Sequence, residues 1–150
     1  MKKVFAIVLA FVLSISSTVA MAASVSESFT GKLYYKFPDG TMNVTNQVIG
    51  TATHSYLVKT NTSGLYSGAI DQGTTCRAGS RTTSITKSSN PVFSTTVSSD
   101  HKKITVRYSG GSVQISYHGM IIVDSQGNQT LSSDVATHGA SFNATKTHTK

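Results

Sequence analysis

The chain has 150 residues and carries 13 Lys and Arg against 6 Asp and Glu, for a formal net charge of +7 at pH 7. This length is that of one domain and is enough to bury a core without a dense framework of disulfides. The single cysteine excludes an internal disulfide, so the stability of the fold must come from packing.

The beginning of the chain has the pattern of a secretory signal. Two lysines precede an apolar run over 4–13, and the small residues Ala20 and Ala22 then fit cleavage after Ala22, with cleavage after Ala20 or Ala23 as alternatives. The apolar run has about ten residues, whereas a membrane-spanning helix needs about 20. We therefore expect no transmembrane segment.

These observations predict a signal peptide over 1–22 and a single β domain over 23–150, secreted or periplasmic in a bacterium. Removing the two leader lysines leaves eleven basic against six acidic residues, a net charge of +5. This excess of basic residues favours both solubility and an anionic partner. Roughly three in ten of the remaining residues are Ser or Thr, and they alternate with Val, Ile, Phe and Tyr, as strands do.

The first strand is expected over 28–37. Its apolar face holds Phe29, Leu33, Tyr35 and Phe37, and its polar face holds Ser28, Thr30, Lys32, Tyr34 and Lys36. A turn over 38–40 leads into a strand that carries Met42, Val44 and Val48 in alternation. A two-residue turn pairs Leu33 with Val44, whereas a bulge at Gly40 shifts this pairing by one residue.

Further strands follow at intervals that are typical of all-β proteins. They are expected over 54–60, 65–70, 81–87, 92–98, 120–123 and 141–145. Turn residues separate them at 61–64, 71–73, 90–91, 100–101 and 124–128. Short strands without intervening helices predict an antiparallel β-sandwich, with a small β-barrel as the alternative.

The clearest hairpin signal lies between residues 103 and 118. Two alternating segments flank Gly110 and Gly111, whose tolerance of positive φ suits a two-residue turn. The resulting register pairs Tyr108 with Val113, Val106 with Ile115, Ile104 with Tyr117 and Lys103 with His118. It therefore places every large apolar residue of both segments on one face.

Few residues suggest catalysis. Glu27 is the only glutamate and lies near the start of the predicted mature chain, and Asp39, Asp71, Asp100 and Asp124 each fall in a turn context where the carboxylate can cap its own backbone. No G-x-S-x-G motif occurs, and the five histidines lack the close spacing of metal ligands. We assign no catalytic residue, no metal site and no cofactor, and we do not expect an enzyme.

Two alternative functions are kept. A metal-independent ribonuclease would use His101, His118, Lys103 and Arg107, which the hairpin brings together. A secreted membrane-active toxin would insert a hairpin with alternating polar and apolar residues.

The preferred hypothesis is a binding protein that acts on an anionic or protein partner in the cell envelope or medium. Lys103, Arg107 and His118 are expected to form one cationic strip, and Lys32, Tyr34 and Lys36 form a second strip with an aromatic ring between two charges. Peripheral contact with a membrane fits the same strips, whereas nucleic acid is not expected as the partner.

Cys76 has two interpretations. It is either a buried small hydrophobic residue or an exposed thiol that links two chains in a disulfide-bonded dimer. The neighbouring Arg77 would favour the thiolate.

Overall fold

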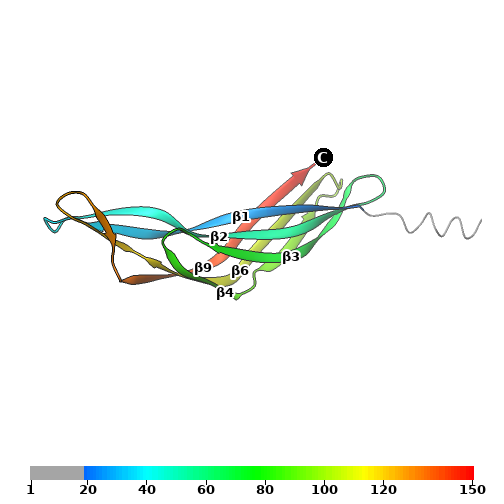
Figure 1. Cartoon of the computed structure of the whole chain (residues 1–150). Coiled ribbons are helices and arrows are strands. Elements are labelled where there is room, and N and C mark those ends of the chain that lie inside the picture. Colours follow the sequence, from blue (N-terminus) through cyan, green and yellow to red (C-terminus); the bar gives the residue numbers. More distant parts are fainter. Residues whose placement is uncertain (1–18) are drawn as a thin grey trace, which may run out of the picture.

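Alternating polar and apolar side chains form nine strands in the computed structural model, which describes residues 19–150 (Figure 1). The strands are β1 (Val19–Lys36), β2 (Met42–Thr60), β3 (Tyr66–Ala78), β4 (Thr82–Ser89), β5 (Val92–Val97), β6 (Lys103–His118), β7 (Met120–Val123), β8 (Gln129–Leu131) and β9 (Val135–Thr149). The described residues contain no helix, so the predicted all-β class is confirmed.

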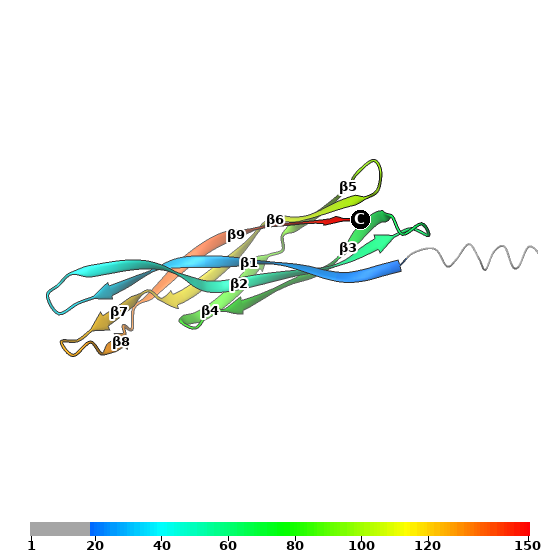
Figure 2. The ribbon, with the colours of Figure 1, turned by 90° about the horizontal axis from the view of Figure 1, so that it is seen from above.

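The strands form two sheets that pack face to face. Sheet A has the order β3-β2-β1-β7-β8, whereas in sheet B the strands β4, β5 and β9 all pair with β6. β9 runs along one side of β6, and β4 and β5 share the other side. The long strands run along the length of the molecule, which is elongated (Figure 1 and Figure 2). The sheets do not close on themselves, so the predicted sandwich is confirmed and the alternative barrel is wrong.

The predicted signal peptide lies largely outside the described residues. Its last four residues, Val19–Ala22, belong to β1 and pair with Leu57–Thr60 at the end of β2. Cleavage after Ala22, which stays a prediction, would therefore shorten β1 and leave the end of β2 without this partner.

The turn between β1 and β2 follows the bulged alternative. Gly40 has φ 86°, and its N–H donates to the carbonyl of Phe37 at 3.0 Å. Val44 consequently pairs with Tyr34 and not with Leu33. Leu33 is 2% exposed while Tyr34 lies on the opposite face, so the predicted partition of side chains along β1 holds.

The predicted hairpin at Gly110 and Gly111 is wrong. β6 continues through both glycines as one strand of 16 residues and pairs with β9 on either side of them. Gly110 pairs with Phe142 and Val113 pairs with Ala140, so β6 has one more residue than β9 between these two pairs. The φ values of 73° and 65° at the two glycines accommodate this extra residue. The pair is therefore a bulge within β6.

The bulge preserves the predicted faces although it changes the pairing. One additional residue inverts the parity of a strand, so even-numbered residues before it and odd-numbered residues after it point to the same side. The buried residues of β6 follow this rule: Ile104, Val106, Tyr108, Val113, Ile115 and Tyr117. A turn and a bulge at the two glycines would both place these six side chains on one face. The sequence pattern therefore cannot distinguish a turn from a bulge.

A second predicted turn, at 71–73, is also a bulge. β3 continues through it, and the register with β2 shifts between Ser55, which pairs with Gly73, and Tyr56, which pairs with Asp71. The predicted turns at 61–64, 100–101 and 124–128 do separate strands. The prediction of short strands therefore fails where a glycine-containing segment lies inside a longer strand.

The core consists of two apolar clusters along the length of the sandwich. One contains Phe29, Ile49, Ala52, Val113, Ile115, Tyr117 and Phe142, and the other contains Tyr56, Val58, Tyr66, Ile104, Val106 and Tyr108. Along β2, His54 lies between Ala52 of the first cluster and Tyr56 of the second, and it is completely buried. The centre of the molecule is therefore a polar layer between two apolar ones.

The bulge in β6 predicts a specific sensitivity to substitution. A Cβ atom at Gly111 would lie 2.7 Å from backbone atoms of Asn90 and Pro91, at a backbone conformation with φ 65°. We expect Gly111→Ala to lower the free energy of unfolding by about 1–3 kcal/mol, measured by urea denaturation. The control is Gly139→Ala, where a Cβ meets nothing within 4 Å. Equal unfolding midpoints for the two variants would contradict this account of the bulge.

Candidate functional site

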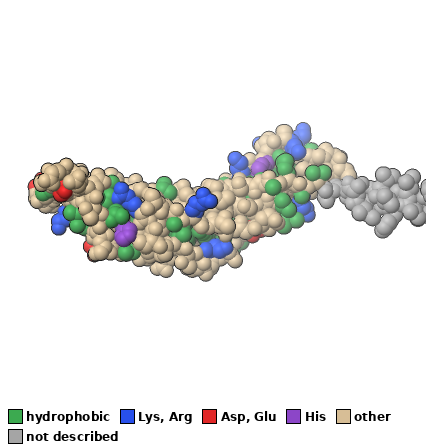
Figure 3. Space-filling model, viewed as in Figure 1, with side chains coloured by type: hydrophobic (Ala, Val, Ile, Leu, Met, Phe, Trp, Pro, Cys, Tyr) green, Lys and Arg blue, Asp and Glu red, His purple; other side chains and the backbone are tan. Residues whose placement is uncertain are grey.

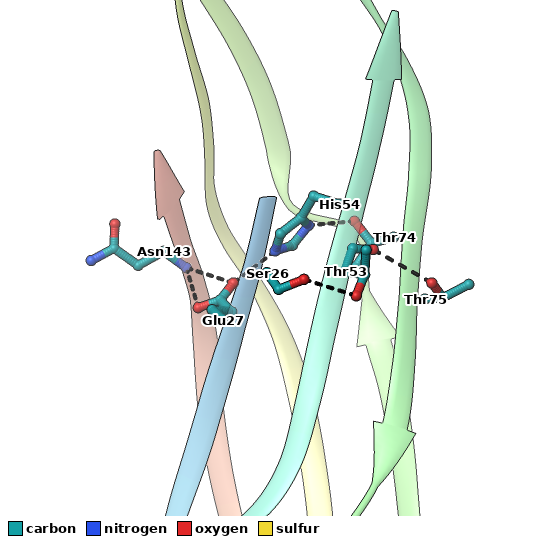
Figure 4. A network of polar contacts seen from close by, with 7 residues as sticks. All are labelled: Ser26, Glu27, Thr53, His54, Thr74, Thr75 and Asn143. Atoms are coloured by element: carbon teal, nitrogen blue, oxygen red, sulfur yellow. Dashed lines mark hydrogen bonds and ion pairs between the residues drawn. The ribbon is translucent and has the colours of Figure 1, made fainter. Parts of the chain in front are cut away.

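A buried polar network occupies the layer between the two apolar clusters (Figure 4). His54 Nε2 donates to Glu27 Oε1 at 2.8 Å, and His54 Nδ1 is 2.7 Å from Thr74 Oγ1. The Glu27 carboxylate also accepts the backbone N–H of Asn143, at 3.1 Å and 3.0 Å for its two oxygens. The network therefore connects β1, β2 and β3 of sheet A to β9 of sheet B.

The network has the chemical order of a hydrolase triad, namely carboxylate, imidazole and hydroxyl. Its surroundings differ from those of a reaction site. The His54 ring stacks on Tyr108 at 4.4 Å between centroids and meets the Phe142 ring edge-on at 5.5 Å. His54 is 0% exposed and Thr74 is 9% exposed, so the packing fits a cross-link between the sheets.

The pattern of residues along the chain did not predict this network. Glu27 was expected near a frayed terminus, but it lies within β1 and pairs with Ala52 of β2. Its partner Asn143 is 116 residues away in the chain. The only local signal was His54 within an apolar alternation, at a position that faces the core.

A second polar contact, between the buried Tyr108 and the exposed Asp71, lies beside the first. The Tyr108 hydroxyl lies 2.9 Å from Asp71 Oδ1 and 3.0 Å from the carbonyl oxygen of Ser55, and these two acceptors share its single O–H. Burial raises the pKa of Tyr108, and the carboxylate of Asp71 adds to the shift. Asp71 also accepts the N–H of Gly73 at 2.8 Å, so it caps its own segment as expected while also holding a core tyrosine.

The predicted strip of Lys103, Arg107 and His118 is not assembled. Lys103 and His118 stand at opposite ends of β6, roughly 50 Å apart at about 3.3 Å per residue. His118 Nδ1 is 3.1 Å from the carbonyl of Ser132. The predicted pairing of Lys103 with His118 is therefore wrong, and the four groups proposed for a ribonuclease are not brought together.

Lys103 and Arg107 do share the outer face of β6. They lie about 13 Å apart along the strand, with Thr105 between them. Cross-strand pairing surrounds them with hydroxyl groups, because Ser94 and Thr145 flank Arg107, Thr96 and Thr147 flank Thr105, and Thr149 is opposite Lys103. We call these eight residues the basic face of sheet B.

Positive charge gathers at the end of the molecule that carries the basic face. Six of the eleven Lys and Arg of residues 19–150 lie in the strand ends and turns there: Lys59, Lys102, Lys103, Arg107, Lys146 and Lys150. The carboxylates at this end are Asp71, held by Tyr108, and Asp100, whose Oδ1 accepts from Ser98 and from the Lys102 N–H. Figure 3 shows Lys and Arg side chains at this end, on the right of the view.

The second predicted strip is intact at the other end of the molecule. Lys32, Tyr34 and Lys36 lie on the outer face of β1, since Leu33 between them points into the core. Their cross-strand neighbours on the same face are Asn46, Val44 and Met42 of β2, together with Met120 and Ile122 of β7. We call these eight residues the β1–β2–β7 face.

Two shallow hollows adjoin this face along the edge of β1. One, of about 190 Å³, is lined by Lys32, Tyr34, Tyr117, Gly119, Met120, Asp134, Val135 and Ala136, and the other, of about 450 Å³, includes Asn46 and His138. Tyr117 can reach the edge of β1 because a Cβ at Gly31 would lie 2.7 Å from its ring. Its hydroxyl donates to the carbonyl of Lys32 at 3.2 Å.

Cys76 fits the interpretation of a buried hydrophobic side chain. It is partly buried against the cluster around Phe29 and pairs with Ala52, which is 0% exposed. Burial raises the pKa of its thiol. Arg77 follows it on a strand and so points to the opposite face, which explains why the expected support for the thiolate is not seen.

No known protein provides an assignment for this chain. Comparison with protein-family models, with curated proteins and with solved structures gives no match. Between residues 19 and 150, no three His, Cys, Asp or Glu side chains gather so that they could hold a metal ion. From Val19 onward, no helix has the length and apolar character needed to cross a bilayer. The function must be inferred from the surfaces described above.

The buried network predicts an asymmetry between two adjacent threonines. Thr74→Val keeps the shape of the side chain but leaves His54 Nδ1 without a partner, so we expect a loss of about 1–3 kcal/mol in the free energy of unfolding. The matched control is Thr75→Val, because Thr75 is exposed and makes only a 3.5 Å contact to the carbonyl of Thr53. Urea denaturation that ranks the two variants equally would contradict a structural role for the network.

The environment of Cys76 predicts slow alkylation. A raised pKa leaves less thiolate at a given pH, and partial burial limits access. We expect iodoacetamide to react with the native protein at pH 8 at least about tenfold more slowly than with the protein in urea. The pH midpoint of the reaction should lie above that of the unfolded chain. Equal rates in both states would show that the thiol is freely exposed.

Proposed function

We propose that the protein is an exported bacterial protein that binds an anionic ligand through the basic face of sheet B. The observation that carries this proposal is the position of Lys103 and Arg107 on one strand face, at the end of the molecule that holds six of the eleven Lys and Arg residues between 19 and 150. The predicted signal peptide supports a place of action in the cell envelope or the medium.

The chemistry of the face suits sulfate, phosphate or carboxylate groups. Lys and Arg form charge-assisted hydrogen bonds with such groups, and the hydroxyls that flank Thr105 and Arg107 can donate further ones. Thr105 Oγ1 and Thr147 Oγ1 already lie 3.0 Å apart, so these side chains form an ordered row. The row is polar and exposed to solvent, as expected of a surface that binds charged ligands.

The spacing of the two cations favours a polymer over a single small anion. Lys103 and Arg107 are separated by about 13 Å along the backbone, so each can contact a separate sulfate or phosphate group. A chain with repeated anionic groups, such as an acidic glycan or a teichoic acid, could engage both at once. Binding would then weaken steeply as salt concentration rises.

Heparin, a sulfated glycan, serves as the probe for this proposal. We expect Lys103→Glu combined with Arg107→Glu to reduce the slope of log Kd against log salt concentration by about two or more. The matched control, Lys32→Glu combined with Lys36→Glu, makes the same change in net charge at the other end and should keep the parent slope. Equal losses in both double variants, or weak binding of the parent at low salt, would refute the proposal.

A further inference from the structure

We infer that the β1–β2–β7 face docks on the interface of an anionic phospholipid bilayer. This inference is independent of the proposed function, because it concerns the opposite end of the molecule and a different kind of contact. The contact is peripheral: the side chains of the face enter the headgroup region, and the sheet stays outside the hydrocarbon region of the bilayer.

Three exposed apolar side chains lie together on this face. Met42 is 57% exposed, Val44 is 51% exposed and Ile122 is 46% exposed. Pairing of Lys36 with both Met42 and Ile122, and of Tyr34 with both Val44 and Met120, puts all of them on one side of three adjacent strands. Single exposed aliphatic residues are ordinary, but a group of them on one sheet face marks a surface that contacts something.

The face is supported from behind by the core. Leu33 and Ile121, which alternate with its residues along β1 and β7, are 2% and 1% exposed. The backbone hydrogen bond from Tyr34 N to the carbonyl of Gly119, at 2.8 Å, joins the two strands. The exposed side chains therefore project from a rigid sheet, and their exposure is not that of a loose loop.

The polar residues of the face identify the partner as a lipid surface. Tyr34 combines a ring with a hydroxyl, and Lys32 and Lys36 can bury their aliphatic stems while the ammonium groups reach phosphates. The nearby carboxylates of Asp39 and Asp124 lie in the turns beyond the strand ends, where Thr41 and Asn128 hold them at 2.9 Å or less. A third carboxylate, Asp134, lines the hollow at the edge of the face, beside Lys32 and Tyr34. Within the face itself the charged groups are both positive, which complements an anionic headgroup layer.

The absence of tryptophan from the sequence permits a direct test. Val44→Trp places a single fluorescent reporter on the face, and Val92→Trp places one on the other sheet, at a 66% exposed position of β5 that pairs with Ser109 about midway along β6. With vesicles of phosphatidylglycerol and phosphatidylcholine, we expect a blue shift and quenching by brominated lipid for Val44→Trp. We expect neither change for Val92→Trp.

Two further variants in the otherwise native chain separate the apolar and the electrostatic parts of the contact. Met42→Ser combined with Val44→Ser should weaken vesicle binding about tenfold while heparin binding stays unchanged. Lys32→Glu combined with Lys36→Glu should remove the preference for anionic over neutral vesicles. Far-UV circular dichroism of each variant confirms that the β structure is retained.

The outcomes that overturn the inference are distinct from those that test the proposed function. No shift of the Val44→Trp emission on anionic vesicles, or an equal shift of Val92→Trp, refutes docking through this face. A shift with a soluble protein partner and none with vesicles assigns the face to a protein and also refutes it. Loss of heparin binding in Lys103→Glu with Arg107→Glu bears only on the basic face of sheet B.

Discussion

The contact between Glu27, His54 and Thr74 is the constraint on which the rest of the sandwich depends. A long, narrow sandwich has little depth of core at any point, and here its apolar interior is divided into two clusters. The imidazole lies at the division, where it stacks on Tyr108 of one cluster and contacts Phe142 of the other. Since an unpaired buried imidazole is costly, the carboxylate and the hydroxyl must both stay in place, and they fix four strands relative to one another.

Alternation along the chain was sufficient to predict the class of fold and the face on which most side chains lie. It correctly grouped Tyr108 with Val113 and Ile115 in the core, and Lys32 with Tyr34 and Lys36 on the outside. It could not decide whether Gly110 and Gly111 reverse the chain or bulge within it, because both arrangements bury the same residues. The bulge is what separates Lys103 from His118, so the error in local geometry became an error in the candidate site.

Contacts between distant residues were outside the reach of the pattern. The Glu27 carboxylate meets a backbone N–H of β9, and no periodicity relates those two positions. Only the β1 part of the β1–β2–β7 face could be predicted, because its residues alternate in sequence. The β7 part could not, because β7 joins the face through parallel pairing with a strand more than 80 residues earlier. The partition of charge between the two ends is also a property of the folded chain alone, because it arises from which turns and termini meet.

The central place of β6 has a consequence for the order in which the protein can assemble. β4 and β5 precede β6 in the chain, but β9 comes last and covers the whole of its other side. Until residues 135–149 have been made, the longest inward-facing strand of sheet B has an open edge and cannot bury its neighbours. Folding of that sheet is thus tied to the synthesis of residues 135–149, and the many contacts between segments far apart in sequence imply slow closure. A chain that has not yet reached these residues therefore has no partner for one edge of β6 along its length.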